Sequence, residues 1–281
     1  MTKPRILVTG SSGWIGAAVA ERMAGEAEVV GLDLLPGPWT SALGDITDSR
    51  LIAELVRGKD AVIHIAALHA PHVRVRSEEE FRRTNIDGTA ILLQAALRAG
   101  VRRFVLTSTT SVYGCTSRAG EAAIWVTENL EPNPEDIYDV TKLEAERLCR
   151  EAGRARMSTV ILRVSRSFPE PDSLVAFYRL YRGVDRRDVA EGHWLAAAVP
   201  WDGCEIFNLS AKPVFKPEDA PFLRNDPWPV IDRRAPEVGE VFRRRGWEKP
   251  AAIDRVYAID KAESRLGYHP RYGFREAVAD L

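Results

Sequence analysis

The sequence has few features that would support a metal centre, a disulfide framework or a membrane anchor. Its three cysteines, Cys115, Cys149 and Cys204, are far apart and in no metal-ligand spacing, so we expect reduced thiols, no metal and a cytoplasmic protein. No apolar run is long enough to cross a bilayer, and the opening residues lack a signal-peptide pattern. Lysine plus arginine number 39 against 40 aspartate plus glutamate. This balance argues against nucleic acid or a membrane as a partner.

What the sequence does contain is a regular alternation of strand and helix patterns. Strands are predicted at residues 5–9, 28–33, 60–65, 103–108 and 159–164, and helices at 14–24, 48–57, 78–99 and 136–152. Near-continuous apolar strands separated by helices indicate a parallel sheet covered on both faces. We therefore predict an α/β fold, a Rossmann-like doubly wound parallel sheet with a small C-terminal substrate-binding region.

The alternation weakens after the fifth strand. A helix at 187–199 and a strand at 204–209 are still predicted, whereas residues 213–236 hold six prolines and are predicted to be mostly loop. Two more helices are predicted near 237–245 and 260–266.

The length of 281 residues allows one large domain or one domain with a small appendage. We expect residues 1–165 to form the Rossmann domain, with 186–212 returning to it. Residues 166–185 and 213–281 are expected to form the small substrate-binding region, or cap.

The first strand ends in a glycine-rich turn, Gly10-Ser11-Ser12-Gly13-Trp14-Ile15-Gly16, that opens the first helix. Glycines there permit a tight turn and let the backbone approach a pyrophosphate, and the helix N-terminus supplies free N–H groups. The alternative is a tight turn that binds nothing, but the position between a strand and a helix favours a dinucleotide site. We expect the cofactor to contact Gly10, Ser12, Gly13, Trp14, Ile15 and Gly16.

Asp33 ends the second strand, about twenty residues after the glycines. A carboxylate there accepts hydrogen bonds from a ribose diol and repels a 2′-phosphate. Leu34, Leu35 and Pro36 follow it, with no arginine to receive that phosphate. The sequence therefore favours NAD over NADP.

Tyr138 and Lys142 stand four residues apart on a predicted helix and therefore share one face. A free tyrosine has a pKa of about 10 and is a poor base at neutral pH. A neighbouring ammonium and the positive nicotinamide of an oxidised cofactor would lower that pKa. Tyr138 could then take a proton from a carbinol while hydride leaves for the cofactor.

The fourth strand ends in a hydroxyl-rich segment, Thr107 to Ser111. Ligands bind at the carboxyl ends of parallel strands, so a hydroxyl here could hold the substrate oxygen beside Tyr138. The alternative is a turn whose hydroxyls satisfy their own backbone. Tyr138 and Lys142 downstream favour the catalytic interpretation.

Together these features resemble the extended short-chain dehydrogenase/reductases, the NAD-dependent epimerase/dehydratase group. The resemblance covers at least residues 4–165. Its seven parts are Gly10/Gly13/Gly16, Asp33, Asp45-Ile46, His64-Ile65-Ala66-Ala67, Asn85 in Asn-Ile-Asp-Gly-Thr, Thr109 to Gly114, and Tyr138 with Lys142.

The resemblance implies roles for further residues. Asp45 and Ile46 would hold the adenine, and Ala66 and Ala67 would line the ribose and nicotinamide. Asn85 would steady the site. The resemblance also implies a catalytic triad of Thr109, Tyr138 and Lys142, and a homodimer formed through the helices at 78–99 and 136–152.

Downstream of the fifth strand the chain departs from sugar-nucleotide epimerases. Arg163-Val164-Ser165-Arg166-Ser167-Phe168-Pro169-Glu170-Pro171 replaces Arg-x-x-Asn-x-Tyr-Gly-Pro and looks more like uronate dehydrogenases. Those enzymes hold a sugar carboxylate with a nearby arginine, which implies Arg166 or Arg179 as an anion anchor. The alternative is a surface arginine whose stem covers apolar surface. The tentative substrate residues are His69, Ser111, Ser165, Arg166 and Arg179.

We therefore expect reversible hydride transfer between NAD and a carbinol or hemiacetal of a sugar or sugar acid. Two alternatives stay open: a nucleotide-sugar epimerase or dehydratase that retains NAD, and a non-catalytic protein that senses NAD. Accumulation of NADH would distinguish a dehydrogenase from an epimerase, which shows no net absorbance change.

Overall fold

The computed structural model describes residues 2–114, 122–155 and 157–279; Cys115 lies outside them. Seven parallel strands form one sheet in the order β3-β2-β1-β4-β5-β7-β8. They are β1 (Arg5–Thr9), β2 (Glu28–Asp33), β3 (Ala42–Leu43), β4 (Ala61–His64), β5 (Arg103–Thr109), β7 (Ser158–Val164) and β8 (Cys204–Leu209). Strand order reverses on either side of β1, as in a doubly wound sheet. The predicted Rossmann-like fold is confirmed.

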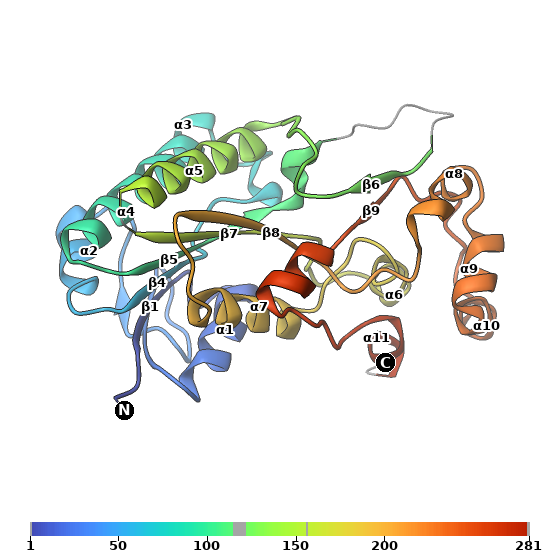
Figure 1. The fold of residues 1–281 in the computed structure, drawn as a ribbon, viewed down its shortest axis with the longest axis horizontal. Helices are drawn as coiled ribbons and strands as arrows, with labels where there is room; N and C mark the ends of the chain where they lie inside the picture. The colour runs from blue at the N-terminus through green and yellow to red at the C-terminus, as the bar shows by residue number, and fades with distance from the viewer. Residues whose placement is uncertain (1, 115–121, 156, 280–281) are drawn as a thin grey trace.

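Helices cover both faces of this sheet, as Figure 1 shows. One layer contains α1 (Trp14–Ala24) and α7 (Arg186–Ala198), and the other contains α2 (Ser49–Leu55), α4 (Gly88–Arg98) and α5 (Ile137–Arg154). Successive strand residues alternate between the two layers, because side chains of a strand point to opposite faces. Ile6 and Val8 pack with α1 and α7, whereas Leu7 packs with the other helices.

The helix predicted at 78–99 is interrupted. It consists of α3 (Glu78–Phe81), a π-helix (Arg82–Asp87) and α4. Asn85 lies in the π segment, and its side chain bonds to the backbone of Leu68 in the loop after β4. Such π segments widen a helix locally and are common at functional sites.

A second group of elements packs around its own core and is called here the small lobe. It contains β6 (Ile124–Val126), which pairs with β9 (Arg255–Tyr257), and the helices α6 (Asp172–Tyr178), α8 (Ala220–Leu223), α9 (Trp228–Arg234), α10 (Pro236–Arg245) and α11 (Phe274–Ala279). Figure 1 shows α8, α9 and α10 at the far end of the molecule from α2. Phe177, Trp228 and Phe242 are at the centre of this core.

One prediction for this part of the chain is wrong. Residues 213–236 are not mostly loop, because α8 and α9 lie within them. Pro221 and Pro229 stand in the first turn of these helices, where the missing N–H costs no helical hydrogen bond. The helix predicted near 260–266 is confirmed: residues 260 and 261 are α-helical, and a short π-helix follows at Ala262–Leu266.

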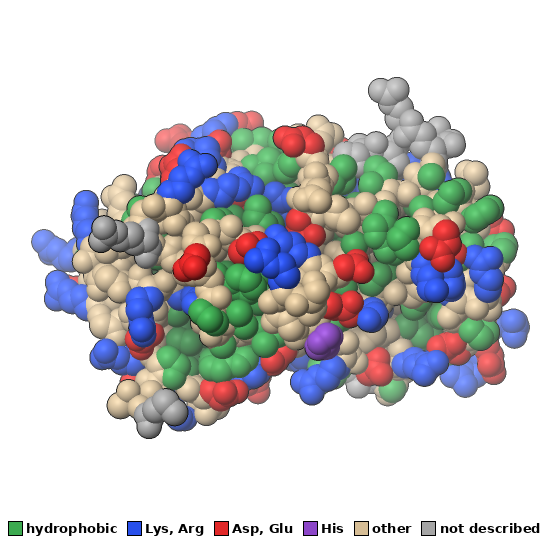
Figure 2. Space-filling view, viewed as in Figure 1, with side chains coloured by type: hydrophobic (Ala, Val, Ile, Leu, Met, Phe, Trp, Pro, Cys, Tyr) green, Lys and Arg blue, Asp and Glu red, His purple; other side chains and the backbone are tan. Residues whose placement is uncertain are grey.

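The described residues contain no cluster that could hold a metal ion and no helix long and apolar enough to cross a bilayer. Cys149 and Cys204 are free thiols. On the face drawn in Figure 2, acidic and basic side chains are interspersed. This agrees with the balanced composition and shows no single-sign surface there.

Candidate active site

The carboxyl ends of β1, β2, β4, β5 and β7 open into a cavity of about 640 Å³, called here the main cavity. Most of the predicted site residues line it: Gly10, Gly13, Trp14, Ile15, Gly16, Asp33, Asp45, Ile46, Ala66, Ala67, His69, Thr109, Ser111, Tyr138, Lys142, Ser165 and Arg166. Ser12, Asn85 and Arg179 do not line it. Ser12 and Asn85 instead bond to the lining residues Asp33 and Leu68, and Arg179 lines a second, smaller cavity.

The glycine turn is shaped by two close backbone approaches. Gly10 has φ +75°, and a Cβ there would lie 2.8 Å from the Ala66 nitrogen. A Cβ on Gly16 would overlap the carbonyl oxygen of Gly10. No described side chain caps α1 at Gly13. The first-turn N–H groups therefore remain for a ligand, and the positive end of the helix dipole favours an anion there.

Asp33 lies where the adenosine ribose of a dinucleotide would meet the turn. Its carboxylate accepts hydrogen bonds from the N–H of Ser12 at 2.9 Å and of Leu35 at 3.0 Å. These bonds hold the carboxylate at the cavity wall, and the neighbouring Leu34 and Leu35 side chains are exposed and apolar. The glycine turn and this carboxylate together fit NAD.

Thr109, Tyr138 and Lys142 meet at the opposite end of the main cavity. Asp136 caps the N-terminus of α5 by accepting from the Asp139 N–H at 2.9 Å. Tyr138 and Lys142 lie one turn apart on this helix, and Thr109 ends β5. The geometry predicted from their spacing is observed.

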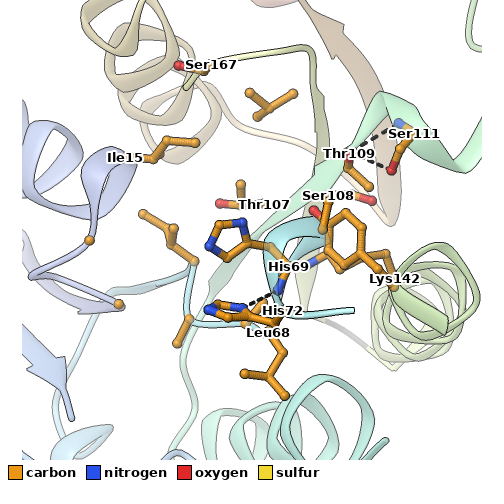
Figure 3. A pocket seen from close by; sticks show the side chains of 18 of the residues that line it. Ile15, Leu68, His69, His72, Thr107, Ser108, Thr109, Ser111, Lys142 and Ser167 are labelled. Carbon is orange, nitrogen blue, oxygen red and sulfur yellow. Dashed lines mark hydrogen bonds between the residues drawn. The ribbon is translucent and has the colours of Figure 1, made fainter. Parts of the chain in front are cut away.

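Thr109 is held in place by its neighbours, as Figure 3 shows. Its Oγ1 accepts a hydrogen bond from the Ser111 N–H at 3.1 Å and is 3.0 Å from the Ser111 hydroxyl. Ser111 in turn donates to Asp139 at 2.5 Å. Asp139 is buried, and burial raises the pKa of its carboxyl group. Thr109, Ser111 and Asp139 thus form one hydrogen-bonded group beside Tyr138.

Burial dominates the electrostatics of the tyrosine and the lysine. It raises the pKa of Tyr138 above its usual value, against the effect of a hydrogen bond with Thr109, and Asp139 and Asp136 raise it further. Burial also lowers the pKa of Lys142 to about 8. The expected lowering of the Tyr138 pKa by its ammonium neighbour is not observed, because Lys142 is not among the groups that shift this pKa in the structure. The phenol is protonated at neutral pH.

Asn85 connects the loop after β4 to the helix that carries Tyr138. Its amide oxygen accepts from the Leu68 N–H at 2.8 Å, and its nitrogen donates to the Leu68 carbonyl at 2.9 Å and to the Thr141 hydroxyl at 3.0 Å. Thr141 donates to the Tyr138 carbonyl at 3.0 Å. Asn85 therefore positions the cavity wall, in the manner that the resemblance implies.

Two histidines line the main cavity on the short 3-10 helix after β4. His72 Nδ1 accepts from the His69 N–H at 3.0 Å, and the two rings are 4.5 Å apart. The His69 ring also stacks on Phe168, with ring centres 6.0 Å apart. Burial lowers the pKa of both histidines. They enter the cavity as neutral hydrogen-bonding groups at neutral pH.

The two predicted anion anchors lie in different surroundings. Arg166 lines the main cavity but is held by Glu170 through bonds of 2.8 and 2.9 Å from its Nε. Arg179 lines a second cavity and pairs with Asp185 at 3.1 Å. The structure therefore brings Arg166, and not Arg179, to the catalytic group.

Among the lining residues that sequence reasoning missed, three come from beyond residue 180. Arg182 follows α6, and Arg255 and Tyr257 lie on β9. Arg255 donates to the Gly114 carbonyl at 2.6 Å and to Asp254 at 2.8 Å. No local motif marks these residues, because the fold of the small lobe brings them to the cavity from far along the chain.

The comparison with known proteins agrees with this geometry. Residues 6–171, more than half of the chain, match the model of the NAD dependent epimerase/dehydratase family. The chain belongs to this family. It is therefore an NAD-dependent enzyme, as the sequence predicted.

Individual relatives cover different shares of the chain. A 3 beta-hydroxysteroid dehydrogenase/Delta 5-->4-isomerase of Mycobacterium tuberculosis is 29% identical over 98% of this chain and 89% of its own length. A uronate dehydrogenase of Pseudomonas putida is 30% identical over 60% of this chain and 63% of its own length. The solved structure of MoeE5 in complex with UDP-glucose and NAD has a TM-score of 0.71 and 25% identity, and the match covers 98% of this chain and 96% of that chain.

Proposed function

We propose that this protein catalyses reversible hydride transfer between NAD and a carbinol or hemiacetal of a sugar or sugar acid. The observation that carries the proposal is that one cavity is lined both by the glycine turn with Asp33 and by Thr109, Tyr138 and Lys142. NAD, when bound, supplies the hydride acceptor or donor.

In this proposal each catalytic side chain has a separate task. Thr109, held by Ser111, orients the substrate oxygen. Tyr138 exchanges a proton with that oxygen, and its protonated phenol is ready to donate in the direction of carbonyl reduction. In the direction of oxidation the phenol must lose its proton, and Lys142 as an ammonium would stabilise the phenolate. Lys142 therefore matters most when the substrate is an alcohol.

The polar lining of the cavity supports a sugar-like substrate. Ser111, Ser165, His69 and His72 supply hydroxyl and imidazole groups around the catalytic end. A steroid, which the mycobacterial relative's name includes, has few groups that could use the remaining hydrogen-bonding capacity of these side chains, and would cover it at a cost in free energy. A polyhydroxylated substrate would bond to them.

The charges at the outer end of the cavity support an acidic substrate. Arg166, Arg182 and Arg255 all line it. Arg166 is paired with Glu170 and Arg255 with Asp254, while Arg182 is 3.8 Å from an Asp254 oxygen. Three guanidinium groups thus face two carboxylates. A carboxylate or phosphate of the substrate would balance the remaining charge.

A second candidate is an epimerase or dehydratase that retains NAD. The side chains of Glu135, Asp136 and Asp139 line the cavity beside Tyr138, and a carboxylate there could serve as a second acid or base at a neighbouring carbon. A non-catalytic NAD sensor is less favoured, because such a protein would have no use for Thr109, Tyr138 and Lys142 in one cavity.

The test is a screen for NADH appearance with aldoses, uronates and nucleotide sugars. We expect NADH to accumulate with at least one sugar or sugar acid. If substrate turns over with no net absorbance change and the protein co-purifies with NAD, the second candidate is correct. If no substrate of these classes is consumed, the proposal is wrong.

We further propose a division of the chain into a Rossmann domain of residues 1–165 with 186–212, and a substrate-binding region of 166–185 and 213–281. The separate core of the small lobe supports this division. A cytoplasmic homodimer, with no nucleic-acid or membrane partner, completes the proposal. Sedimentation analysis of the purified protein would test the dimer.

A further inference from the structure

A second cavity of about 300 Å³ adjoins the main cavity, and the function proposed above does not use it. Trp14, Ser167 and Phe168 line both cavities. Its far wall is formed by Arg179 and by the start of α7, from Val184 to Arg187. Its volume is well above the ~30 Å³ that one water occupies in the liquid, so it has room for a small ligand.

Two buried polar atoms of this cavity lack partners. Ser167 is 6% exposed and Arg179 is 8% exposed. Within the described part of the chain, neither the Ser167 hydroxyl oxygen nor the Arg179 Nε has a hydrogen-bond partner. An unpaired buried donor destabilises the protein, because it has given up its bond to water without a replacement. Because an arginine Nε–H can only donate, the missing partner must offer an acceptor atom.

The charge of the lining favours a negatively charged acceptor. Three arginines, Arg179, Arg186 and Arg187, line the cavity together with one carboxylate, Asp185. Asp185 already accepts from the Arg179 Nη2 at 3.1 Å and from the Arg187 N–H and Nε at 2.9 Å each. Its charge is thereby compensated, and it does not oppose an anion at the other wall.

The position of Arg186 also favours a negatively charged ligand. It is the first residue of α7, a helix of 13 residues, and its side chain is exposed. Its guanidinium lies 4.3 Å from the centre of the Trp14 ring, on the wall shared with the main cavity. Asp185 caps this helix, so the guanidinium of Arg186 is the positive group at this wall.

From this geometry we propose that the second cavity is an oxoanion site that takes a phosphate or carboxylate group beside the cofactor. Ser167 and the Arg179 Nε would donate to its oxygens, and Arg186, for which no ion pair is seen among the described residues, would supply positive charge at the opening. Phe168 stacks on His69 of the main cavity, so a ligand in the second cavity would contact a wall of the catalytic site.

Inorganic phosphate is the probe. Calorimetric titration of the full chain with phosphate, at constant ionic strength and with saturating NAD, should show one saturable site. Arg186→Gln should weaken binding about tenfold, and Ser167→Ala about two- to tenfold, the ranges for a charged and a neutral hydrogen bond. Ser158→Ala is the matched control, because it removes another unpartnered buried hydroxyl, at the start of β7. It should bind like the unmodified protein.

Three results would overturn the proposal. They are the absence of saturable phosphate binding, binding that is equal in all three variants, and binding that disappears when NAD saturates the protein. The last would mean that phosphate occupies the cofactor's own place on the glycine turn. If Ser167→Ala fails to fold, Arg186→Gln alone tests the proposal, because Arg186 is exposed and its substitution should leave folding intact. Because the readout is binding and not turnover, failure here leaves the proposed function untouched.

Discussion

The sheet and the small lobe contribute different kinds of residue to the same cavity. The sheet supplies the glycine turn, Asp33 and the group around Tyr138 from the ends of successive strands and helices. The small lobe supplies Arg255 and Tyr257 from β9. Groups for cofactor and chemistry thus come from the regular part of the fold, and charges that could select a substrate come from the irregular part.

The largest expected effect concerns the chemistry that the sheet carries. Tyr138→Phe should lower turnover by about 10²–10⁴-fold, the usual contribution of a general acid–base group, while the affinity for NAD stays nearly unchanged. Turnover assays and NAD titration measure the two quantities. Tyr113→Phe is the control, because the Tyr113 phenol is buried against Asn208 and lines neither cavity. Near-normal turnover of Tyr138→Phe would remove this tyrosine from the mechanism.

A buried ion pair under the sheet and an exposed one in the small lobe should differ in their contribution to stability. Glu146 accepts from Arg163 at 2.7 and 2.9 Å and from Ser108 at 2.7 Å beneath the catalytic helix. Glu146→Ala would leave a buried charge unpaired and should lower the free energy of unfolding by about 3–5 kcal/mol. Glu237→Ala, which breaks an exposed pair with Arg275 in the small lobe, should cost at most about 1 kcal/mol. Equal effects in urea unfolding would contradict this contrast.

The buried lysine of the sheet should make stability depend on pH. Its pKa falls from 10.5 to about 8 on folding. Below pH 8 the folded protein must bury an ammonium, whereas between pH 8 and 10 the unfolded chain binds more protons than the folded one. Lys142 therefore contributes a rise in stability with pH in this window, on the order of 3 kcal/mol. The buried Cys149 thiol, whose pKa burial raises, contributes in the opposite direction. Lys142→Met should remove the lysine's contribution, and the same slope in both proteins would refute the explanation.

A smaller effect is expected for cofactor selection. Asp33→Ala removes the carboxylate that we expect to bind the ribose and should weaken NAD binding about 10- to 100-fold, the range for a charged hydrogen bond. The preference for NAD over NADP should narrow at the same time. Asp48→Ala, which removes the N-cap of α2 outside the cavity, serves as the control. An unaltered ratio of the two affinities would exclude Asp33 from the ribose site.

The contrast between the sheet and the small lobe also explains which site residues could be predicted from the sequence. The glycine turn, Asp33 and the Tyr138–Lys142 pair lie in local strand–turn–helix units, so spacing alone revealed them. Arg182 and Arg255 were missed because tertiary packing brings them to the cavity. Local sequence patterns also gave no measure of burial. Burial raises the pKa of Tyr138, whereas a lowering was expected. The prolines of α8 and α9 suggested loops. A proline is compatible with the first turn of a helix, but the sequence did not show that helices begin at these prolines.

The central claim is that the glycine turn presents NAD to Tyr138. A crystal structure of the protein with NAD tests it most directly. We predict the pyrophosphate on the N-terminus of α1, a ribose diol on Asp33, and the nicotinamide facing the Tyr138 phenol and the Lys142 ammonium. A dinucleotide bound away from the turn, or a Tyr138 phenol turned away from the nicotinamide, would contradict the account.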